Sequence, residues 1–321
     1  MGLKLGIDIG STTVKVVIMD GDAILWRRYE RHFSQVRQKT AELLEAARQV
    51  VGDQPLHAAV SGSAGFGVAK LIGMQFIQEV FATGQAIRYF GIDADAVIEL
   101  GGEDAKILFL TGGVEERMNG SCAGGTGAFI DQMATLLHMT PAEMNEAAKT
   151  AQKTYTIASR CGVFAKSDVQ PLLNQGASKN DVALSIFGAV VNQTIAGLAQ
   201  GRPITGNVLY LGGPLTFSRI LRESFDRTLG VQGTCPKNSL LFVALGAAYY
   251  SDQTFDLEAV ANALQERGAS ETYRSQPPLF SSKEEYEAFR ARHAKAAVPR
   301  VPFTADYAAP VHIGIDSGST T

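Results

Sequence analysis

The run from Asp8 to Thr13, with the sequence DIGSTT, is the first feature of the chain that could do chemistry. An apolar stretch ends there, Gly10 permits a tight turn, and a second apolar stretch begins at Val14. Backbone N–H groups in such a turn, together with Ser and Thr hydroxyls, can donate hydrogen bonds to phosphate oxygens. Asp8 at the end of the strand can hold a hydrated magnesium ion. The candidate phosphate-binding residues are Gly10, Ser11, Thr12, Thr13 and Lys15.

This run differs from the two common glycine-rich nucleotide motifs. No G-x-x-x-x-G-K-[ST] P-loop occurs in the chain. A dinucleotide fingerprint requires a helix after the turn, whereas the apolar pattern after Gly10 is that of a strand. Standing alone, the motif would be an ordinary Gly-Ser hairpin turn, but two further glycine-rich strand ends favour a nucleotide site.

Those two strand ends each carry paired glycines. The run from Glu99 to Asp104 reads ELGGED, and the run from Leu209 to Pro214 reads LYLGGP. Two facing hairpins, each with an acidic residue, can clamp phosphates and magnesium from both sides, while the third turn can admit adenine and ribose. The expected catalytic residues are Asp8, Glu99 and Asp104, with Asp8 also holding magnesium through water. The glycine-rich positions expected to bind nucleotide are Gly101, Gly102, Gly212, Gly213 and Pro214.

Apolar periodicity divides the chain into alternating strands and helices. Each acidic hairpin begins a unit of three strands, expected over 3–9, 14–19 and 24–31, and again over 96–100, 105–110 and 114–118. Further strands are expected over 56–61 and 207–211, and helices over 35–51, 85–90, 125–138, 163–174, 181–200, 216–229 and 240–250. Two similar units followed by helices predict two related α/β lobes with a cleft between them.

Two further runs are distinctive: Met118 to Gly127 reads MNGSCAGGTG, and Ser159 to Ala165 reads SRCGVFA. With these runs, and over roughly residues 3 to 250, the chain resembles the ATP-dependent activators of 2-hydroxyacyl-CoA dehydratases and the related ATPase subunits of benzoyl-CoA reductase. This resemblance implies two ribonuclease-H-like lobes of the actin, sugar-kinase and heat-shock-chaperone ATPase superfamily, with magnesium–ATP or –ADP in the cleft. It also implies a homodimer and a role for Gly124, Gly125 and Thr126 in cofactor binding.

Cys122 and Cys161 lie within these two runs. In the family, the matching cysteines of two subunits hold one [4Fe–4S] cluster, and ATP hydrolysis drives one electron from it to a dehydratase or reductase partner. A four-iron cluster needs four thiolates and the chain has three cysteines, so a two-fold pair could supply two each. Both residues precede expected helices, whose N-termini favour thiolates. The alternative is two buried structural cysteines, and Cys235 is expected to be structural.

The second hairpin departs from the family's usual sequence, Asp-Ile-Gly-Gly-Gln-Asp. Glu99 replaces the first Asp and Glu103 replaces the Gln. The longer side chain at residue 99 can still hold magnesium through water but shifts the geometry, which predicts slow hydrolysis or nucleotide binding with little turnover. Two alternatives share the fold: a small-molecule kinase with Asp104 as its base, and a non-catalytic ATP-switched scaffold.

The first motif recurs at the far end, where Gly314 to Thr321 read GIDSGSTT against GIDIGSTT at Gly6 to Thr13. We therefore expect a longer protein with a second, similar domain, which could supply the other pair of cysteines in place of a second copy of the chain. The expected organisation is a first lobe over 1–95 completed by a helix near 239–252, a second lobe over 96–238, an extension over 253–310, and the start of the second domain over 311–321.

Composition limits the classes of partner. Charged residues make up 19% and the formal net charge is −3, so neither nucleic acid nor an anionic membrane surface is expected as a partner. The start of the chain lacks the apolar core of a secretory signal, and no apolar run reaches the roughly 18 residues that span a bilayer. Three cysteines do not make a disulfide framework. These features predict a cytoplasmic protein.

Overall fold

The computed structural model describes residues 2–119, 124–158, 162–266, 277–299, 302 and 310–316. The chain forms two compact units, Met1–Gly268 and Ala269–Thr321. The first unit consists of two α/β lobes and contains the candidate site.

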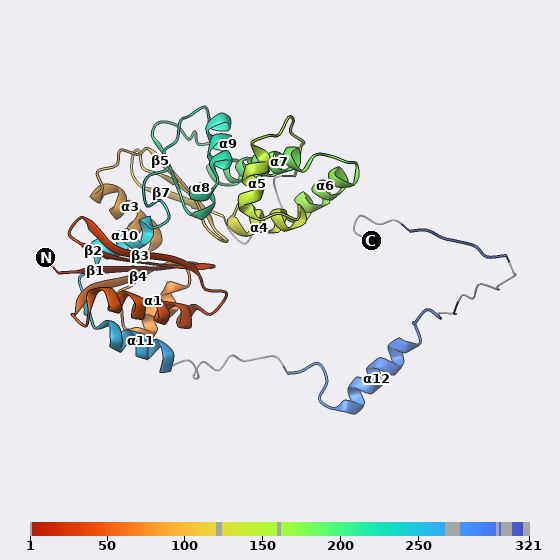
Figure 1. The fold of residues 1–321 in the computed structure, drawn as a ribbon, viewed down its shortest axis with the longest axis horizontal. Helices are drawn as coiled ribbons and strands as arrows, with labels where there is room; N and C mark the ends of the chain where they lie inside the picture. Colours follow the sequence, from red (N-terminus) through yellow and green to blue (C-terminus); the bar gives the residue numbers. More distant parts are fainter. Residues whose placement is uncertain are drawn as a thin grey trace. The chain divides into compact units, whose positions relative to one another are not determined.

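The first lobe is a five-stranded sheet with helices on both faces (Figure 1). Its strands, from one edge to the other, are β3 (Ala23–Arg31), β2 (Thr13–Asp20), β1 (Lys4–Ile9), β4 (Leu56–Ser61) and β9 (Thr254–Phe255). β1 runs antiparallel to β2 and parallel to β4. β2 is largely apolar on both faces because alternate residues enter two different cores: Val14, Val16 and Ile18 enter one, and Val17 and Met19 enter the other.

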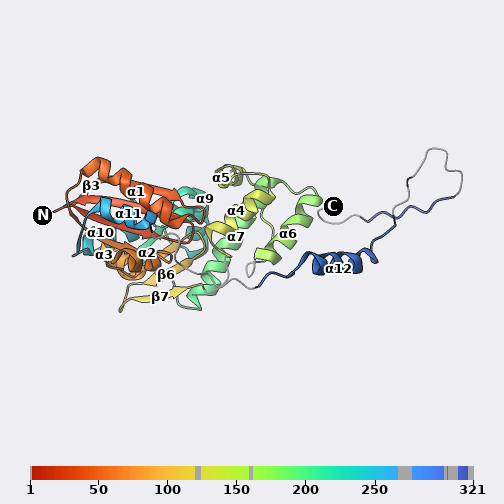
Figure 2. The same cartoon turned by 90° about the horizontal axis from the view of Figure 1, so that it is seen from below.

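Two sets of helices cover this sheet. α1 (Val36–Val51), α2 (Gly65–Ile72) and α11 (Leu257–Glu266) share one core with the sheet, and Figure 2 shows α1 and α11 side by side. α3 (Glu79–Tyr89) and α10 (Phe242–Tyr250) cover the other face. α10 fits closely, because a Cβ at Gly6 would collide with the Ala244 carbonyl and a Cβ at Gly246 would collide with the Ala82 carbonyl.

The second lobe repeats this plan on a four-stranded sheet. Its strands, in spatial order, are β7 (Glu115–Met118), β6 (Ala105–Phe109), β5 (Ala96–Leu100) and β8 (Val208–Leu211). β5 runs antiparallel to β6 and parallel to β8, as β1 does with β2 and β4. The helices are α4 (Gly127–Leu136), α5 (Pro141–Ala148), α6 (Gly162–Asn174), α7 (Lys179–Thr194), α8 (Gly213–Phe217) and α9 (Arg219–Leu229).

α10 also packs against the second lobe. Its residues Ala244, Leu245 and Ala248 share one apolar cluster with residues from both sheets. The strand residues of that cluster are Val17, Met19, Val97, Leu108, Leu209 and Leu211. The two sheets are thus held around one apolar helix, which fixes where their hairpins meet.

The structure corrects the expected end of the compact domain. The sequence predicts an extension from residue 253, but β9 pairs with β4, and α11 packs on α1 within the first-lobe core. Leu257, Val260, Ala261 and Leu264 recur at helical spacing and are buried. The compact unit therefore ends at Gly268.

The helices predicted over 85–90 and 216–229 also differ from expectation. The helix predicted over 85–90 begins at Glu79, where the Gln78 side chain caps it by accepting a hydrogen bond from the Phe81 N–H. The helix predicted over 216–229 is divided into α8 and α9, because Ser218 has an extended backbone and its hydroxyl caps α9.

Within the described residues, one helix is long and apolar enough, by length and mean hydropathy, to cross a bilayer. It is α7 with its continuation, a π-helical turn at Ile195–Ala199. Of its most apolar window, 61% is buried inside the protein, and Ile186, Phe187 and Val190 belong to the second-lobe core. This burial accounts for its apolar composition.

The second unit contains the helix α12 (Lys283–Ala294), which begins after Ser282, whose hydroxyl accepts a hydrogen bond from the Glu285 N–H. α12 has no buried residue, and the ring of Phe280 contacts those of Tyr286 and Phe289. Of the repeated motif at Gly314 to Thr321, residues 314–316 are without regular structure, and residues 317–321 lie outside the described residues.

Candidate functional site

The first hairpin brings Asp8 and Lys15 together. They are cross-strand neighbours on β1 and β2, and Lys15 Nζ lies 2.9 Å from Asp8 Oδ2. The turn between them is closed by a hydrogen bond of 3.0 Å from the Gly10 N–H to the Thr13 carbonyl. Burial alone would lower the pKa of Lys15, but the charge and hydrogen bond of Asp8 outweigh it and raise the pKa. The Lys15 ammonium group therefore stays protonated beside Asp8, and both residues line the cavity described below.

His32 orders this turn, and no motif in the sequence marks it. The Ser34 N–H donates to His32 Nδ1 at 3.1 Å, so the ring proton lies on Nε2, which donates to the Gly10 carbonyl at 3.1 Å. The His32 N–H also donates to the Thr12 carbonyl at 3.2 Å. The ring is buried, and the following residues Phe33 and Ser34 have φ of 46° and 64°, which is costly for side chains other than glycine. The signal available from the sequence was only its place at the end of the third strand.

The second hairpin repeats the acid–lysine arrangement. Glu99 and Lys106 are cross-strand neighbours on β5 and β6, as Asp8 and Lys15 are on β1 and β2. Lys106 also forms an ion pair with Glu79 of α3. Burial raises the pKa of Glu99, the charge of Lys106 opposes this rise, and Glu79 and Asp8 add to it. A carboxyl group of this kind ionises more readily when a cation such as magnesium arrives.

The two hairpin turns touch. A Cβ at Gly102 would collide with the Thr12 side chain, so glycine at residue 102 permits the contact. The carbonyls of Gly101 and Gly102 accept hydrogen bonds from the N–H groups of Gly127 and Ala128, at 2.9 and 2.7 Å. The start of α4 is therefore attached to the second hairpin.

The third glycine turn packs against both lobes. Gly212 has φ of 85°, and a Cβ there would collide with the Leu100 carbonyl. At Gly213 a Cβ would lie 3.0 Å from the Tyr29 hydroxyl of the first lobe. Thr216 donates from its hydroxyl to the Gly212 carbonyl at 2.7 Å and holds this turn at the start of α8.

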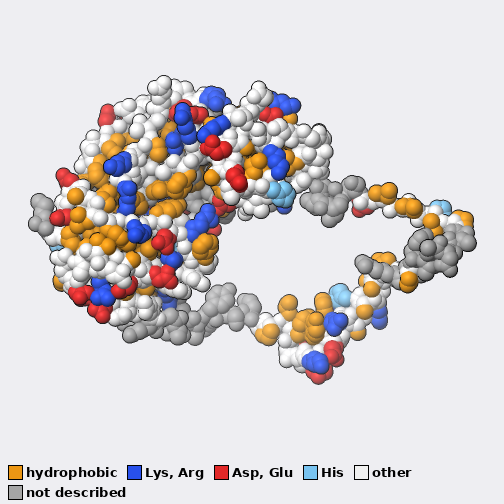
Figure 3. Space-filling view, viewed as in Figure 1, with side chains coloured by type: hydrophobic (Ala, Val, Ile, Leu, Met, Phe, Trp, Pro, Cys, Tyr) orange, Lys and Arg blue, Asp and Glu red, His pale blue; other side chains and the backbone are white. Residues whose placement is uncertain are grey.

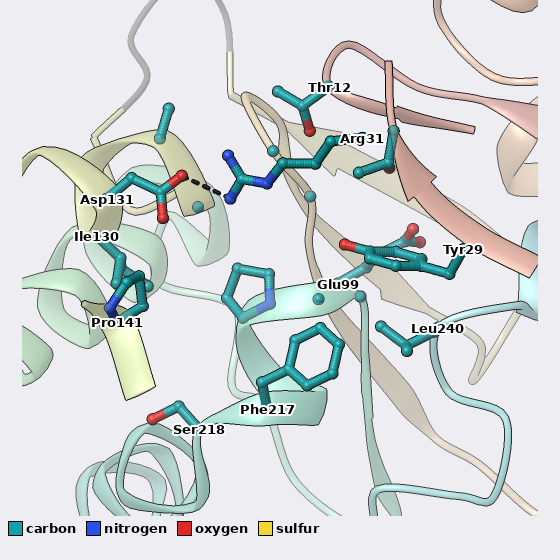
Figure 4. Close-up of a pocket in the computed structure, with 18 of the residues that line it drawn as sticks. Thr12, Tyr29, Arg31, Glu99, Ile130, Asp131, Pro141, Phe217, Ser218 and Leu240 are labelled. Atoms are coloured by element: carbon teal, nitrogen blue, oxygen red, sulfur yellow. Dashed lines mark hydrogen bonds and ion pairs between the residues drawn. The ribbon is translucent and has the colours of Figure 1, made fainter. Parts of the chain in front are cut away.

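A cavity of about 530 Å³ lies where these three turns meet. Ten of the predicted residues line it: Asp8, Thr12, Thr13, Lys15, Glu99, Gly101, Gly102, Gly212, Gly213 and Pro214. Beyond the polar turns its wall becomes apolar, and Figure 3 shows hydrophobic side chains gathered on this face of the first unit. No motif in the sequence predicts the residues of this apolar wall. They include Tyr29, Ile130, Pro141, Phe217 and Leu240 (Figure 4).

The aromatic rings of Tyr29 and Phe217 meet edge to face inside the cavity, with 6.0 Å between their centroids. Tyr29 comes from β3 of the first lobe and Phe217 from α8 of the second. An apolar, aromatic wall opposite a polar end suits a ligand with a flat apolar ring and a charged tail.

Some predicted residues lie outside the cavity lining. Asp104 closes the second hairpin through its backbone carbonyl, which accepts from the Gly101 N–H at 2.7 Å. Gly124 and Gly125 pack against Gln193 and Thr194 of α7, where a Cβ at Gly124 would collide with the Gln193 side chain. Gly10, Ser11 and Thr126 are likewise absent from the described lining, to which α4 instead contributes Gly127 and Ala128.

One ion pair joins the lobes at the cavity. Arg31, the last residue of β3, places Nη2 2.8 Å from Oδ2 of Asp131 on α4. Both residues line the cavity, and Figure 4 shows the guanidinium beside Thr12 and directed at the carboxylate.

Cys122 and Cys161 lie outside the described residues. α6 begins at Gly162, and α4 begins at Gly127, two residues later than predicted. Within the described part of the chain, no three His, Cys, Asp or Glu side chains gather as a metal site. Cys235 is partly buried and donates from Sγ to Ser239 Oγ at 3.3 Å.

Residues 5–256 match the family model of the BadF/BadG/BcrA/BcrD ATPase family. The chain belongs to this family. The resemblance drawn from the two cysteine-containing runs is thereby confirmed.

The chain is similar to two named relatives and to one solved structure. The (R)-2-hydroxyglutaryl-CoA dehydratase activating ATPase of Acidaminococcus fermentans is 30% identical over 255 residues, which cover 77% of this chain and 96% of that protein. The activator of lactoyl-CoA dehydratase from Anaerotignum propionicum is 31% identical over 255 residues, with coverage of 77% and 96%. The crystal structure of the Acidaminococcus fermentans (R)-2-hydroxyglutaryl-CoA dehydratase component A matches with a TM-score of 0.69 at 27% identity, covering 81% of this chain and 100% of that one. The predicted fold class, two lobes of the actin-like and sugar-kinase ATPase superfamily, is confirmed.

Proposed function

We propose that this member of the ATPase family binds magnesium–ATP between its lobes and hydrolyses it to activate a dehydratase- or reductase-type partner protein. The observation that carries the proposal is the meeting of two acid–lysine hairpins at Thr12 and Gly102, at the polar end of a cavity with an aromatic wall. The relatives named as dehydratase activators support the kind of partner.

The phosphates would lie between the two hairpin turns. The hydroxyls of Thr12 and Thr13 and the ammonium group of Lys15 line that end of the cavity and would bind phosphate oxygens. Asp8 and Glu99 line it as well and offer the oxygen ligands that hydrated magnesium takes. On nucleotide binding, the Lys15 ammonium group would leave Asp8 and pair with phosphate instead. The Asp8 carboxylate would then be available to the hydrated magnesium ion.

The nucleoside would lie against the third turn. Gly212 and Gly213 leave room for close approach of the ligand, and the rings of Tyr29 and Phe217 with Leu240 provide an apolar surface for adenine. Because Tyr29 and Phe217 belong to different lobes, a bound nucleoside would contact both lobes at once.

A [4Fe–4S] cluster held by Cys122 and Cys161 of two copies of this fold is the second part of the proposal. The cluster would supply low-potential electron transfer, and the protein's contribution would be to couple its position to the nucleotide. The attachment of α4 to the second hairpin through Gly127 and Ala128 supports this coupling, because α4 follows the stretch that contains Cys122.

Anaerobic purification with iron and sulfide analysis tests the proposal. We expect about four irons and four sulfides per pair of domains, loss of both in Cys122→Ser and Cys161→Ser, and retention in the matched control Cys235→Ser. ATP turnover should be measured in parallel. Turnover without iron that needs a small-molecule phosphate acceptor would point to a kinase, and nucleotide binding without turnover would point to a switched scaffold.

A further inference from the structure

Arg31 lines the end of the cavity to which the proposed function assigns the phosphates. It is the cross-strand neighbour of Thr13, and its chain neighbour His32 donates from its N–H to the Thr12 carbonyl at 3.2 Å. Both threonines line the cavity, as Arg31 does. Figure 4 shows the Arg31 side chain passing below Thr12 and ending at the carboxylate of Asp131.

The partner of Arg31 in the described structure is a carboxylate of the opposite lobe. The side chains of Arg31 and Asp131 are 54% and 36% exposed, and they lie 2.8 Å apart. An ion pair this exposed is weak, because water screens the charges and two long side chains lose freedom. A phosphate group carries more charge than a carboxylate and suits the planar guanidinium equally well, so it can displace Asp131.

Asp131 lies one turn into α4, whose first N–H groups are bonded to the carbonyls of Gly101 and Gly102. The Arg31–Asp131 pair thus joins the end of β3 in the first lobe to the helix that is attached to the second hairpin. When this pair breaks, the first lobe loses a link to α4.

We propose that Arg31 senses the γ-phosphate by exchanging Asp131 for it. With ADP bound, or with no nucleotide, Arg31 pairs with Asp131. With ATP bound, Arg31 turns to the γ-phosphate and releases α4. The inference rests on the proposed nucleotide function and adds the residue that distinguishes ATP from ADP, because a ligand shifts an equilibrium only through contacts that differ between the two states.

Calorimetric titration of the whole chain with magnesium–ATP and magnesium–ADP tests the exchange, using the single variants Arg31→Gln and Asp131→Asn and the double variant. Arg31→Gln is expected to weaken ATP binding about tenfold or more and to change ADP binding less than about twofold. Asp131→Asn removes the competitor and is expected to strengthen ATP binding by about twofold to fivefold. The double variant is expected to match Arg31→Gln, since the effect of Asp131 requires Arg31.

Arg219→Gln is the matched control, because Arg219 forms an exposed ion pair with Glu223 within α9. It should leave both affinities unchanged. An unchanged ratio of ATP affinity to ADP affinity in Arg31→Gln, including an equal loss of both, would overturn the inference. So would a gain in ATP affinity from Asp131→Asn that persists in the double variant, where Arg31 is absent. If the unaltered chain binds neither nucleotide, the proposed function itself fails.

Discussion

Gly102 of the second hairpin lies directly against Thr12 of the first, so closely that a side chain at residue 102 would overlap the threonine. This contact joins the hairpin turns of the two lobes that we propose bind phosphate. The two turns come from separate sheets. α10 packs against both sheets and so fixes the position of one turn relative to the other.

Gly102→Ala should therefore force the turns apart and weaken magnesium–ATP binding about tenfold, the equivalent of a modest overpacking penalty. Gly84→Ala in α3 is the control, because a Cβ there meets no atom within 4 Å. That control should melt at the same temperature or slightly higher, as alanine favours a helix. Calorimetry with both variants would test the contact, and equal affinities would contradict it.

Lys15→Met should destabilise the protein without nucleotide by about 3 kcal/mol, because it leaves the buried Asp8 carboxylate unpaired. Adding Asp8→Asn should restore most of that stability, since both charges are then removed, but should not restore nucleotide binding. Urea unfolding measures the first effect and calorimetry the second. A double variant as unstable as Lys15→Met would show that the pair is not the source of the loss.

Glu99 should make stability depend on pH. Because its folded-state pKa is raised above the ordinary 4.5, the folded protein holds the proton more tightly than the unfolded chain. Its contribution to stability is therefore full below pH 4.5 and is lost as the pH rises through the raised pKa. Glu99→Gln should melt at a higher temperature than the unaltered protein at pH 7 and at nearly the same temperature at pH 4. A difference that does not change with pH would refute this account of Glu99.

Leu264→Ala should lower the free energy of unfolding by about 2–5 kcal/mol, because the side chain is buried between α11 and the first-lobe core. Leu279→Ala provides the same substitution at a leucine that is 92% exposed, and it should change stability by less than about 0.5 kcal/mol. Thermal melting of the two variants would test the assignment of α11 to the compact unit. Equal melting temperatures would restore the boundary near Tyr250.

The hairpins at Asp8 and Glu99 could be predicted because a glycine turn between two apolar runs leaves few alternatives to a strand pair. The part that Tyr29 and Arg31 take in the site could not be predicted, because the role of a strand residue depends on which element faces it. Asp131 and Phe217, which face them, come from helices far along the chain. The sequence around α11 predicts an extension because the buried face of this helix is short and polar residues flank it.

Magnesium-dependent nucleotide binding by the Asp8→Ala variant tests the central claim most directly. Calorimetry of the unaltered chain should show one ATP per first unit, bound more tightly with magnesium than without it. Asp8→Ala should lose the magnesium dependence while keeping its circular dichroism spectrum. Unchanged magnesium–ATP affinity in that variant would contradict a site built on the two acid–lysine hairpins.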